Sequence, residues 1–579
     1  MIKKLLANVG DYKKASLLTP VYVAGEVALD VIMPLIMAMM IDQGIEKGHA
    51  GVILRYGGLL FLCSLLALML GTLGGRTAAI ASAGFARNLR HNLFSKIQDF
   101  SFSNIDRFSS SSLITRMTTD VTNVQNAYQM IIRILVRSPL ILVFSLIMVS
   151  TISPELMLVY LVVLPILAIG LALVIRFAHP LFLKVFRIYD RLNNVVQENL
   201  QGIRVVKSYV REEQQEELFD EVSNDVYRNF TLAQRIVSFN MPLMQFSIYS
   251  CMLLLSWFGA QLIVEHSSLT TGELVSMFNY TMQILMSLMM MSMAFVQILI
   301  ARTSAQRVVE VLDEESDLKN PASPLTEVKD GSIVFENACF SYANDQTRLA
   351  LENVNLRIES GEVIGIIGGT GSAKSTLVQL IPRLYDVIDG RVLVGGQDVR
   401  AYDLAALRDQ VSMVLQNNVL FSGTISENLR WGNAEATDEE IQRVAKIAQA
   451  DPFIQEFPDK YDTLISQGGN NVSGGQKQRL TIARALLKRP KILILDDSTS
   501  AVDTKTDRSI QAGLKQEIPG TTTIIISQRI NSIEDADRII VMDDGKINGI
   551  GTHEELLTSN EIYREVYDSQ QKGFGEGEE

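Results

Sequence analysis

The chain has 579 residues, of which 47% are hydrophobic, and a formal net charge of −12. This length fits two or three domains rather than one. The negative charge disfavours nucleic acid as a partner, because binding a phosphate backbone requires a basic surface. The three cysteines lie far apart and indicate neither a disulfide framework nor a cysteine-based metal site. The five histidines are scattered and form no ligand cluster.

Long apolar segments are concentrated before residue 302, and a bilayer-spanning helix needs about 20 mostly apolar residues. The basic N-terminus lacks the apolar core and cleavage site of a signal peptide, so we expect the first apolar segment to be retained. We predict six membrane-spanning helices near 16–41, 52–75, 131–152, 155–177, 240–264 and 271–301. They form an α-helical membrane domain over residues 1–310, embedded in the lipid bilayer.

Two long amphipathic stretches, 76–130 and 178–239, separate the apolar segments. We expect them to extend helices beyond the membrane and to contact something there; the alternative is a pair of solvated hairpins. Basic residues gather in these stretches and before the first helix, whereas the short connections and their edges are mainly acidic. The positive-inside rule therefore places the termini, both stretches and the soluble half in the cytoplasm, with the chain in the cytoplasmic membrane.

The second half of the chain has the composition of a soluble, charged protein. We expect a linker over 311–331, an α/β domain over 332–570 and an acidic tail over 571–579. Strands alternate with helical stretches, which indicates a largely parallel sheet. The predicted strands are Ile333–Glu336, Val363–Ile367, Ile492–Leu495 and Thr523–Ile526.

A glycine-rich loop follows the strand Val363–Ile367 and precedes an apolar helix, which is the order of a phosphate-binding loop. Its candidate ligand-binding residues are Gly369, Thr370, Gly371, Ser372, Ala373, Lys374, Ser375 and Thr376. Small residues let backbone N–H groups surround phosphates, and the helix N-terminus favours negative charge. Lys374 would reach the β and γ phosphates and Ser375 would ligate Mg²⁺. The consensus has Gly where this chain has Ala373.

Two further motifs follow in the same domain. The apolar strand 491–495 ends in Asp496, a carboxylate that can hold Mg²⁺ beside the loop. Ahead of it stand Ser473, Gly474, Gly475 and Gln476, which can present N–H groups and a hydroxyl to a phosphate at a helix start.

The joint order of these motifs after six apolar segments resembles a half-transporter of the multidrug-exporter type in the ABC family, over essentially the whole chain. The resemblance implies a P-loop nucleotide-binding domain with ATP and Mg²⁺ as cofactors. It also implies a second half-transporter as partner, because each ATP in that family lies between one chain's phosphate-binding loop and the other chain's signature motif.

Further residues are assigned by the same resemblance. Tyr342 matches the aromatic residue that stacks on adenine, and Gln416 matches the glutamine that senses Mg²⁺ and contacts the membrane domain. Ser473–Gln476 match the signature motif, with Val472 in place of the usual Leu. Asp503 matches the acidic residue of the D-loop.

The chain departs from the family at the catalytic positions. Asp497 replaces the Glu that orients the attacking water, and Gln528 replaces the His that contacts the γ-phosphate. With Ala373, these changes resemble the degenerate-site subunit of a bacterial heterodimeric exporter, which binds ATP but hydrolyses it poorly. The alternatives are neutral drift in an active enzyme and a homodimer with slow hydrolysis.

The membrane half offers two sets of substrate-binding candidates. Glu26 and Asp30 share one face of the first predicted helix, and intramembrane carboxylates are either functional or structural. Met282, Met286 and Met289 belong to a methionine-rich sixth helix that suits small amphipathic substrates, unless these residues simply face lipid.

These observations favour ATP-driven export of amphipathic or drug-like compounds. A lipid or peptide exporter of the same architecture stays open. The six spans argue against a regulatory subunit that only binds ATP, and the fusion of membrane and ATPase domains argues against an importer.

Overall fold

The computed structural model describes residues 1–266 and 268–575. The end of the expected acidic tail, residues 576–579, lies outside the described residues. The chain divides into two compact units. One comprises Met1–Gln98 and Ser110–Glu314, and the other comprises Asp99–Ser109 together with the chain from Glu315 onward.

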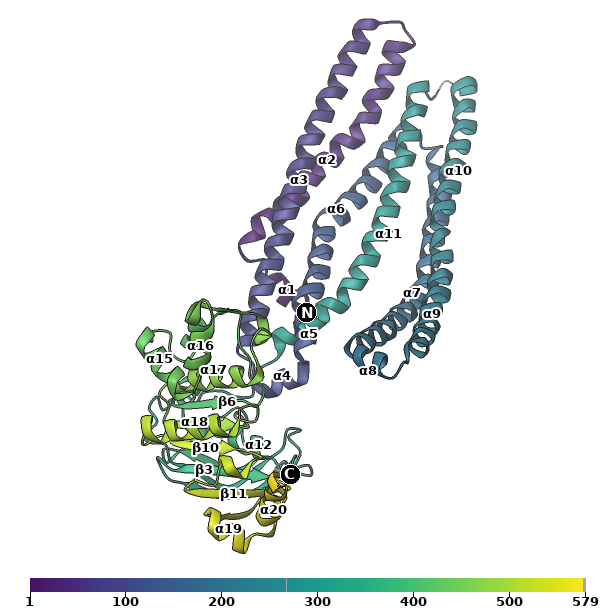
Figure 1. The fold of residues 1–579 in the computed structure, drawn as a ribbon. Helices are drawn as coiled ribbons and strands as arrows, with labels where there is room; N and C mark the ends of the chain where they lie inside the picture. Colours follow the sequence, from purple (N-terminus) through teal and green to yellow (C-terminus); the bar gives the residue numbers. More distant parts are fainter. Residues whose placement is uncertain (267, 576–579) are drawn as a thin grey trace. The chain divides into compact units, whose positions relative to one another are not determined.

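The first unit is helical, and in the described part of the chain six helices are long and apolar enough to cross a membrane. This confirms the predicted class of membrane domain. The helices carry the labels of Figure 1: α2 (Lys13–Met40), α3 (Ala50–Gln98), α6 (Val121–Ile152), α7 (Met157–Gln201), α9 (Glu212–Ser238) followed by α10 (Asn240–Gln261), and α11 (Thr271–Asp313). With its 49 residues α3 is about 74 Å long, more than twice a bilayer's hydrocarbon core.

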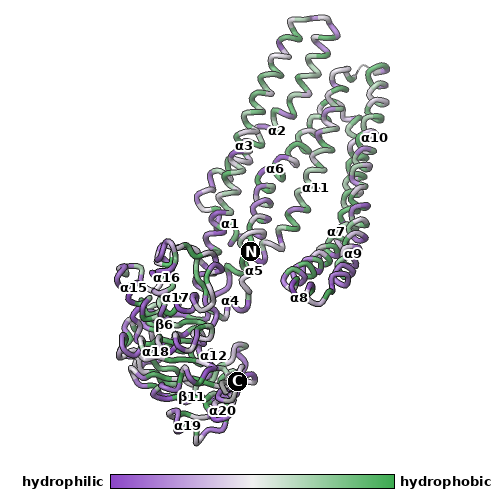
Figure 2. The backbone as a smooth tube through the Cα atoms, in the orientation of Figure 1, coloured by the Kyte–Doolittle hydropathy of each residue, from purple (hydrophilic) through white to green (hydrophobic). Residues whose placement is uncertain are grey.

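Neighbouring helices pair within this unit. Helix α2 packs along α3, α6 along α11, and α7 along α9 and α10 (Figure 1). Figure 2 shows hydrophobic residues dominating α10 and α11, whereas hydrophilic residues gather around α9 and the short α8 (Ile203–Ser208). The second long stretch is therefore a helical hairpin whose far end is polar.

A proline in α2 is compensated by side chains of α11. Pro34 has no N–H, so the carbonyl of Asp30 loses its helical hydrogen-bond donor. The Gln283 amide Nε2 donates to that carbonyl at 3.1 Å. At the next residue of α2, the Val31 carbonyl accepts from the Tyr280 hydroxyl at 2.8 Å. The first bond satisfies a carbonyl that lipid would leave unpaired, and both bonds tie α2 to α11.

The second unit contains the α/β domain. Its main sheet has the strand order β12-β11-β3-β10-β9-β6, and its neighbouring strands are parallel except at the β11–β12 edge. The strands are β12 (Lys546–Gly551), β11 (Arg538–Asp543), β3 (Val363–Gly368), β10 (Thr522–Ile526), β9 (Ile492–Asp496) and β6 (Val411–Val414). The interior strands β9 and β10 are fully buried, and their runs Ile492–Leu495 and Ile524–Ile526 are apolar, as expected of a parallel sheet covered on both faces.

One predicted strand belongs elsewhere. Ile333–Glu336 begin β1 (Ile333–Phe340), which lies in a separate antiparallel sheet with β2 (Leu351–Ile358), β4 (Asp389–Val394) and β5 (Gln397–Asp398). The connection from β1 to β2 spans residues 341–350, which is too short for a helical crossover, so the strands pair antiparallel.

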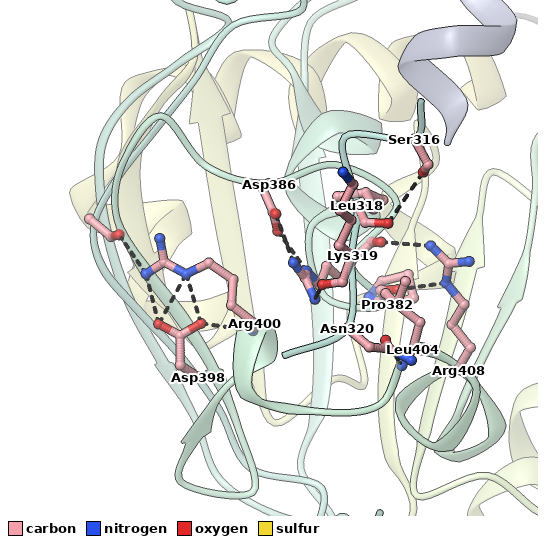
Figure 3. A network of polar contacts seen from close by, with 12 residues as sticks. Ser316, Leu318, Lys319, Asn320, Pro382, Asp386, Asp398, Arg400, Leu404 and Arg408 are labelled. Carbon is pink, nitrogen blue, oxygen red and sulfur yellow. Dashed lines mark hydrogen bonds and ion pairs between the residues drawn. The ribbon is translucent and has the colours of Figure 1, made fainter. Parts of the chain in front are cut away.

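The chain entering this unit is fixed to it by polar contacts. The Lys319 carbonyl accepts from the Arg383 guanidinium at 3.4 Å, within the polar network drawn in Figure 3. Asn320 Oδ1 accepts from the N–H of Leu404, at the start of α13 (Leu404–Gln410). Residues after α11 in the expected linker are thus bound to the α/β unit.

A short helix between α3 and α6 also belongs to this unit. In α4 (Phe102–Phe108), the capping Ser101 and Asn104 satisfy each other's backbone. The Ser103 hydroxyl donates to Asp317 at 2.6 Å, and the Tyr385 hydroxyl donates to Asp106 Oδ2 at 2.8 Å. The expected contact of the first long stretch is therefore with the α/β domain.

Candidate nucleotide site and membrane cavity

The phosphate-binding loop joins the buried strand β3 to α12 (Lys374–Gln379). Gly371 has φ +88°, a left-handed conformation that glycine adopts without steric cost. Ala373 also has a left-handed φ, +67°, immediately before the helix. The chain therefore folds the loop with an alanine in the conformation for which the consensus provides glycine.

Lys374 lies folded over this loop. Its Nζ donates to the carbonyls of Gly368 at 2.9 Å and Gly369 at 2.7 Å, and lies 3.2 Å from the Ser372 hydroxyl. Burial lowers the pKa of Lys374, and the nearby Asp496 and Asp497 partly oppose this shift. The ammonium is thus held at the loop, facing two carboxylates.

Ser375 and Asp496 meet as the motifs predict. The Ser375 hydroxyl donates to Asp496 Oδ1 at 3.0 Å, which brings the start of α12 to the end of β9. Burial raises the pKa of Asp496, while the Ser375 hydrogen bond and Lys374 lower it. A hydroxyl and a carboxylate are hard oxygen donors, so the pair fits Mg²⁺, which takes its other ligands from phosphate and water.

A cavity of about 390 Å³ lies beside the loop. The predicted residues that line it are Tyr342, Thr370, Gly371, Ala373, Lys374, Ser375, Thr376, Gln416, Asp496, Asp497 and Gln528. The fold thus assembles in one place residues from five separate segments. The sequence reasoning missed two other lining segments, Leu349–Ala350 and Asp544–Gly545, which carry no motif and reach the cavity only through the fold.

The two unusual catalytic positions lie together in this cavity. Asp497 has φ +47°, and its N–H donates to the Ile526 carbonyl at 3.0 Å. Burial raises the pKa of Asp497, opposed by Lys374, by Arg529 and by a hydrogen bond from Gln416. The carbonyl of Gln528 accepts from Gln570 Nε2 at 2.7 Å, so the C-terminal helix α20 (Glu561–Gly575) holds this backbone.

The signature residues do not line the cavity. Ser473 caps α17 (Gly474–Leu487): its hydroxyl accepts from the Gln476 N–H at 3.3 Å, and its own N–H donates to Gln476 Oε1 at 2.9 Å. Asp503 caps α18 (Thr504–Glu517) through the Thr506 N–H at 2.9 Å. Within this chain these residues build helix starts apart from the loop.

The adenine-stacking candidate is linked to α4. Tyr342 is 54% exposed, which leaves its ring available to a base. Its hydroxyl lies 2.9 Å from that of Thr376 in α12. The rings of Tyr342 and Tyr385 meet edge to face with centroids 5.3 Å apart, and Tyr385 in turn binds Asp106. Tyr385 therefore contacts both the adenine-stacking candidate Tyr342 and the helix α4.

Comparison with known proteins agrees with this architecture. Residues 18–316 match the family described as the ABC transporter transmembrane region, and residues 351–500 match the family described as ABC transporter. The chain is 36% identical over 569 residues to the "Uncharacterized ABC transporter ATP-binding protein YfiB" of Bacillus subtilis (strain 168), covering 98% of each chain. The chain belongs to the ABC transporter family. It is also 35% identical to YknU of the same organism, over 98% of this chain and 97% of that one.

Membership of this family establishes the general type of activity and the location of the protein in a membrane. This ABC transporter chain fuses a membrane region to an ATP-binding domain, so it is an ATPase-type transporter. Its six apolar helices and ABC domain indicate a multi-pass membrane protein whose nucleotide-binding domain is cytoplasmic.

The membrane carboxylates of this ABC transporter chain have an internal partner. Arg137 of α6 forms ion pairs with both Glu26 and Asp30 of α2, the second at 2.9 Å. This pairing supports the structural alternative for the two acids. Sequence reasoning missed Arg137, although a basic residue inside the apolar segment 131–152 was a usable signal.

The methionines of α11 have different surroundings. The side chains of Met282 and Met286 are exposed on this chain, whereas Met289 packs against a cluster that includes Leu167 and Leu285. The three residues therefore do not form one surface.

Proposed function

We propose that this chain exports amphipathic compounds at the expense of ATP, as one subunit of a heterodimer in which its own loop frames a slow ATP site. The observation that carries the proposal is the cavity in which Asp497 and Gln528 lie beside Lys374 and Asp496. A site that retains its binding residues but has altered catalytic residues is expected to bind ATP and to hydrolyse it slowly.

The chemistry of the two residues supports this reading. A carboxylate that is one methylene shorter than Glu stands farther from the attacking water, and catalysis tolerates displacements near 1 Å poorly. The amide of Gln528 can donate a hydrogen bond but carries no positive charge to stabilise the transition state. Mg²⁺ held by Ser375 and Asp496 would neutralise phosphate charge when bound.

The signature segment supports the complementary half of the proposal. Ser473 and Gln476 form a capping box at the start of α17, outside the cavity of their own chain. Such a helix start is suited to anions. We infer that it completes an ATP site with a partner chain, and that this second site performs most of the hydrolysis.

The link from Tyr342 through Tyr385 to Asp106 supports coupling of nucleotide binding to the membrane unit. α4 is covalently continuous with α3 and with α5 (Ser110–Thr115), so a displacement of α4 would be passed to the long helices. The methionine-rich α11 and the polar groups of α6 favour amphipathic compounds as cargo.

The test is to purify the chain alone and together with a half-transporter that carries Glu and His at the positions equivalent to Asp497 and Gln528. We expect little ATPase activity alone and substrate-stimulated activity after copurification. Replacing the partner's catalytic Glu by Gln should abolish that activity. Robust stimulated hydrolysis by the isolated chain would instead identify a homodimeric exporter.

A further inference from the structure

A second cavity, of about 560 Å³, lies between α6 and α11 in the membrane unit. One stripe of α6 lines most of it, because residues three or four apart share a helix face. The α6 lining residues are Asn126, Gln129, Met130, Arg133, Ile134 and Arg137, and α11 contributes Met290 and Gln297. The cavity thus combines basic, amide and apolar groups.

The two arginines and two carboxylates at this cavity are not paired one to one. Arg137 is paired with both Glu26 and Asp30. The Arg133 side chain, one turn away on the same face, has no hydrogen bond or ion pair with any residue that the structure describes. No acidic residue is among the lining residues and both nearby carboxylates are bound to Arg137, so the Arg133 guanidinium has no direct counter-ion among the described residues.

Arg133 is also kept in place by its packing. It is half-buried, and its guanidinium nitrogens lie within 3.7–3.8 Å of the position that a Cβ would occupy at Gly75 of α3. The Arg133 guanidinium therefore lies against α3 at this glycine. Arg133 lies near the start of the predicted span 131–152, and a basic residue inside a membrane-spanning segment is a candidate functional residue.

We propose that this cavity binds the anionic group of an amphipathic substrate, with Arg133 as its counter-charge. The amides of Gln129 and Gln297 add hydrogen-bond donors around the anion, and Met130, Ile134 and Met290 contact the apolar part. This inference rests on the proposed export function and narrows its cargo to compounds that bear a carboxylate, sulfonate or phosphate.

The experiment measures equilibrium binding without ATP, so that it does not depend on hydrolysis or on the partner's catalytic site. The full chain, with its partner where they copurify, is placed in nanodiscs of zwitterionic lipid. The probes are 12-(dansylamino)dodecanoate and its uncharged methyl ester. Arg133→Gln should weaken binding of the acid about tenfold or more and binding of the ester less than twofold, because only the acid loses an ion pair.

Two further variants control for folding and for general charge. Arg133→Lys retains the charge and should recover most of the binding of the acid. Arg55→Gln removes an exposed arginine from the opposite end of the unit and should change neither probe. An equal loss for both probes, or no loss for the acid in a folded Arg133→Gln protein, would overturn the proposal, even if ATP-driven transport persisted.

The anion has two possible sources, a lipid headgroup or a free amphiphile. Adding phosphatidylglycerol to the nanodiscs distinguishes them. If phosphatidylglycerol displaces the acid from the unaltered protein but not from Arg133→Gln, the cavity binds the lipid headgroup. If the acid stays bound when phosphatidylglycerol is added, the cavity binds the free amphiphile. Competition that is identical in Arg133→Gln and the unaltered protein would contradict the role of Arg133.

Discussion

Tyr385 donates its hydroxyl hydrogen to Asp106 Oδ2 at 2.8 Å while its ring packs against that of Tyr342, so one side chain connects α4 to a residue that lines the nucleotide cavity. Tyr385→Phe keeps the ring and removes the hydrogen bond. We expect ATP binding to persist and the stimulation of ATPase by transported substrate to fall several-fold. ATPase assays with and without substrate in proteoliposomes measure this.

A matched control is Tyr402→Phe, since the Tyr402 hydroxyl donates to the Val394 carbonyl at 2.8 Å inside the α/β unit. That variant should lose about 1 kcal/mol of stability with unchanged stimulation. Equal loss of stimulation in both variants would show that the Tyr385–Asp106 contact has no special role.

The left-handed Ala373 yields a second prediction. An L-residue with a Cβ costs about 1 kcal/mol in this conformation, and glycine does not. Ala373→Gly should therefore raise the melting temperature slightly and should not weaken ATP binding. The control is Ala445→Gly in the helix α15 (Asp438–Ile447), which should lower it, since Gly is about 0.5–1 kcal/mol less stable than Ala within a helix. A lower melting temperature for Ala373→Gly would contradict the expected strain.

A third set of variants distinguishes the contributions of the two ATP sites to the ATPase activity of the heterodimer. Asp497→Ala should leave most of the ATPase activity, because little hydrolysis passes through this chain's own site. Gly474→Ala should reduce it about a hundredfold if the added methyl group displaces a group needed in the partner's transition state. Comparable losses in both variants would identify Asp497 as a working catalytic residue.

The choice of Gly474 comes from its surroundings. A Cβ at Gly474 would meet its nearest atom, Ala501 Cβ, at 3.6 Å, which is an ordinary contact. At Gly475 the nearest atom would be the Ala501 carbonyl oxygen at 2.8 Å, so substitution there disturbs this chain itself. Gly474→Ala should therefore melt like the unaltered protein, whereas Gly475→Ala should not.

A fourth prediction concerns the membrane ion pairs. Arg137→Gln leaves Glu26 and Asp30 without their cation, which should cost about 2 kcal/mol or more and lower the melting temperature. Adding Glu26→Gln and Asp30→Asn should restore much of this loss, because all three groups are then neutral. If the triple variant melted no higher than Arg137→Gln, the ion pairs would not be the source of stability.

Features that depend on contiguous residues could be predicted from the sequence. The loop from Gly369 to Thr376 follows from local order, and long apolar runs imply the six helices. The Arg137–Glu26 pair joins residues 111 positions apart, and such a pair depends on how α2 and α6 pack. Likewise, no local pattern indicated that Tyr385 would meet Asp106. Distant side-chain partnerships therefore required the fold.

The α/β unit includes residues 99–109, which precede its main segment by some two hundred positions. A boundary drawn at residue 315 thus cuts through a folded body. Chimeras that exchange cassettes between half-transporters would need to carry α4 with the graft, or to match the receiving α4 to Phe102 and Asp106. We expect the same condition to apply to natural recombination, so that residues 99–109 and the cassette are inherited as matched segments.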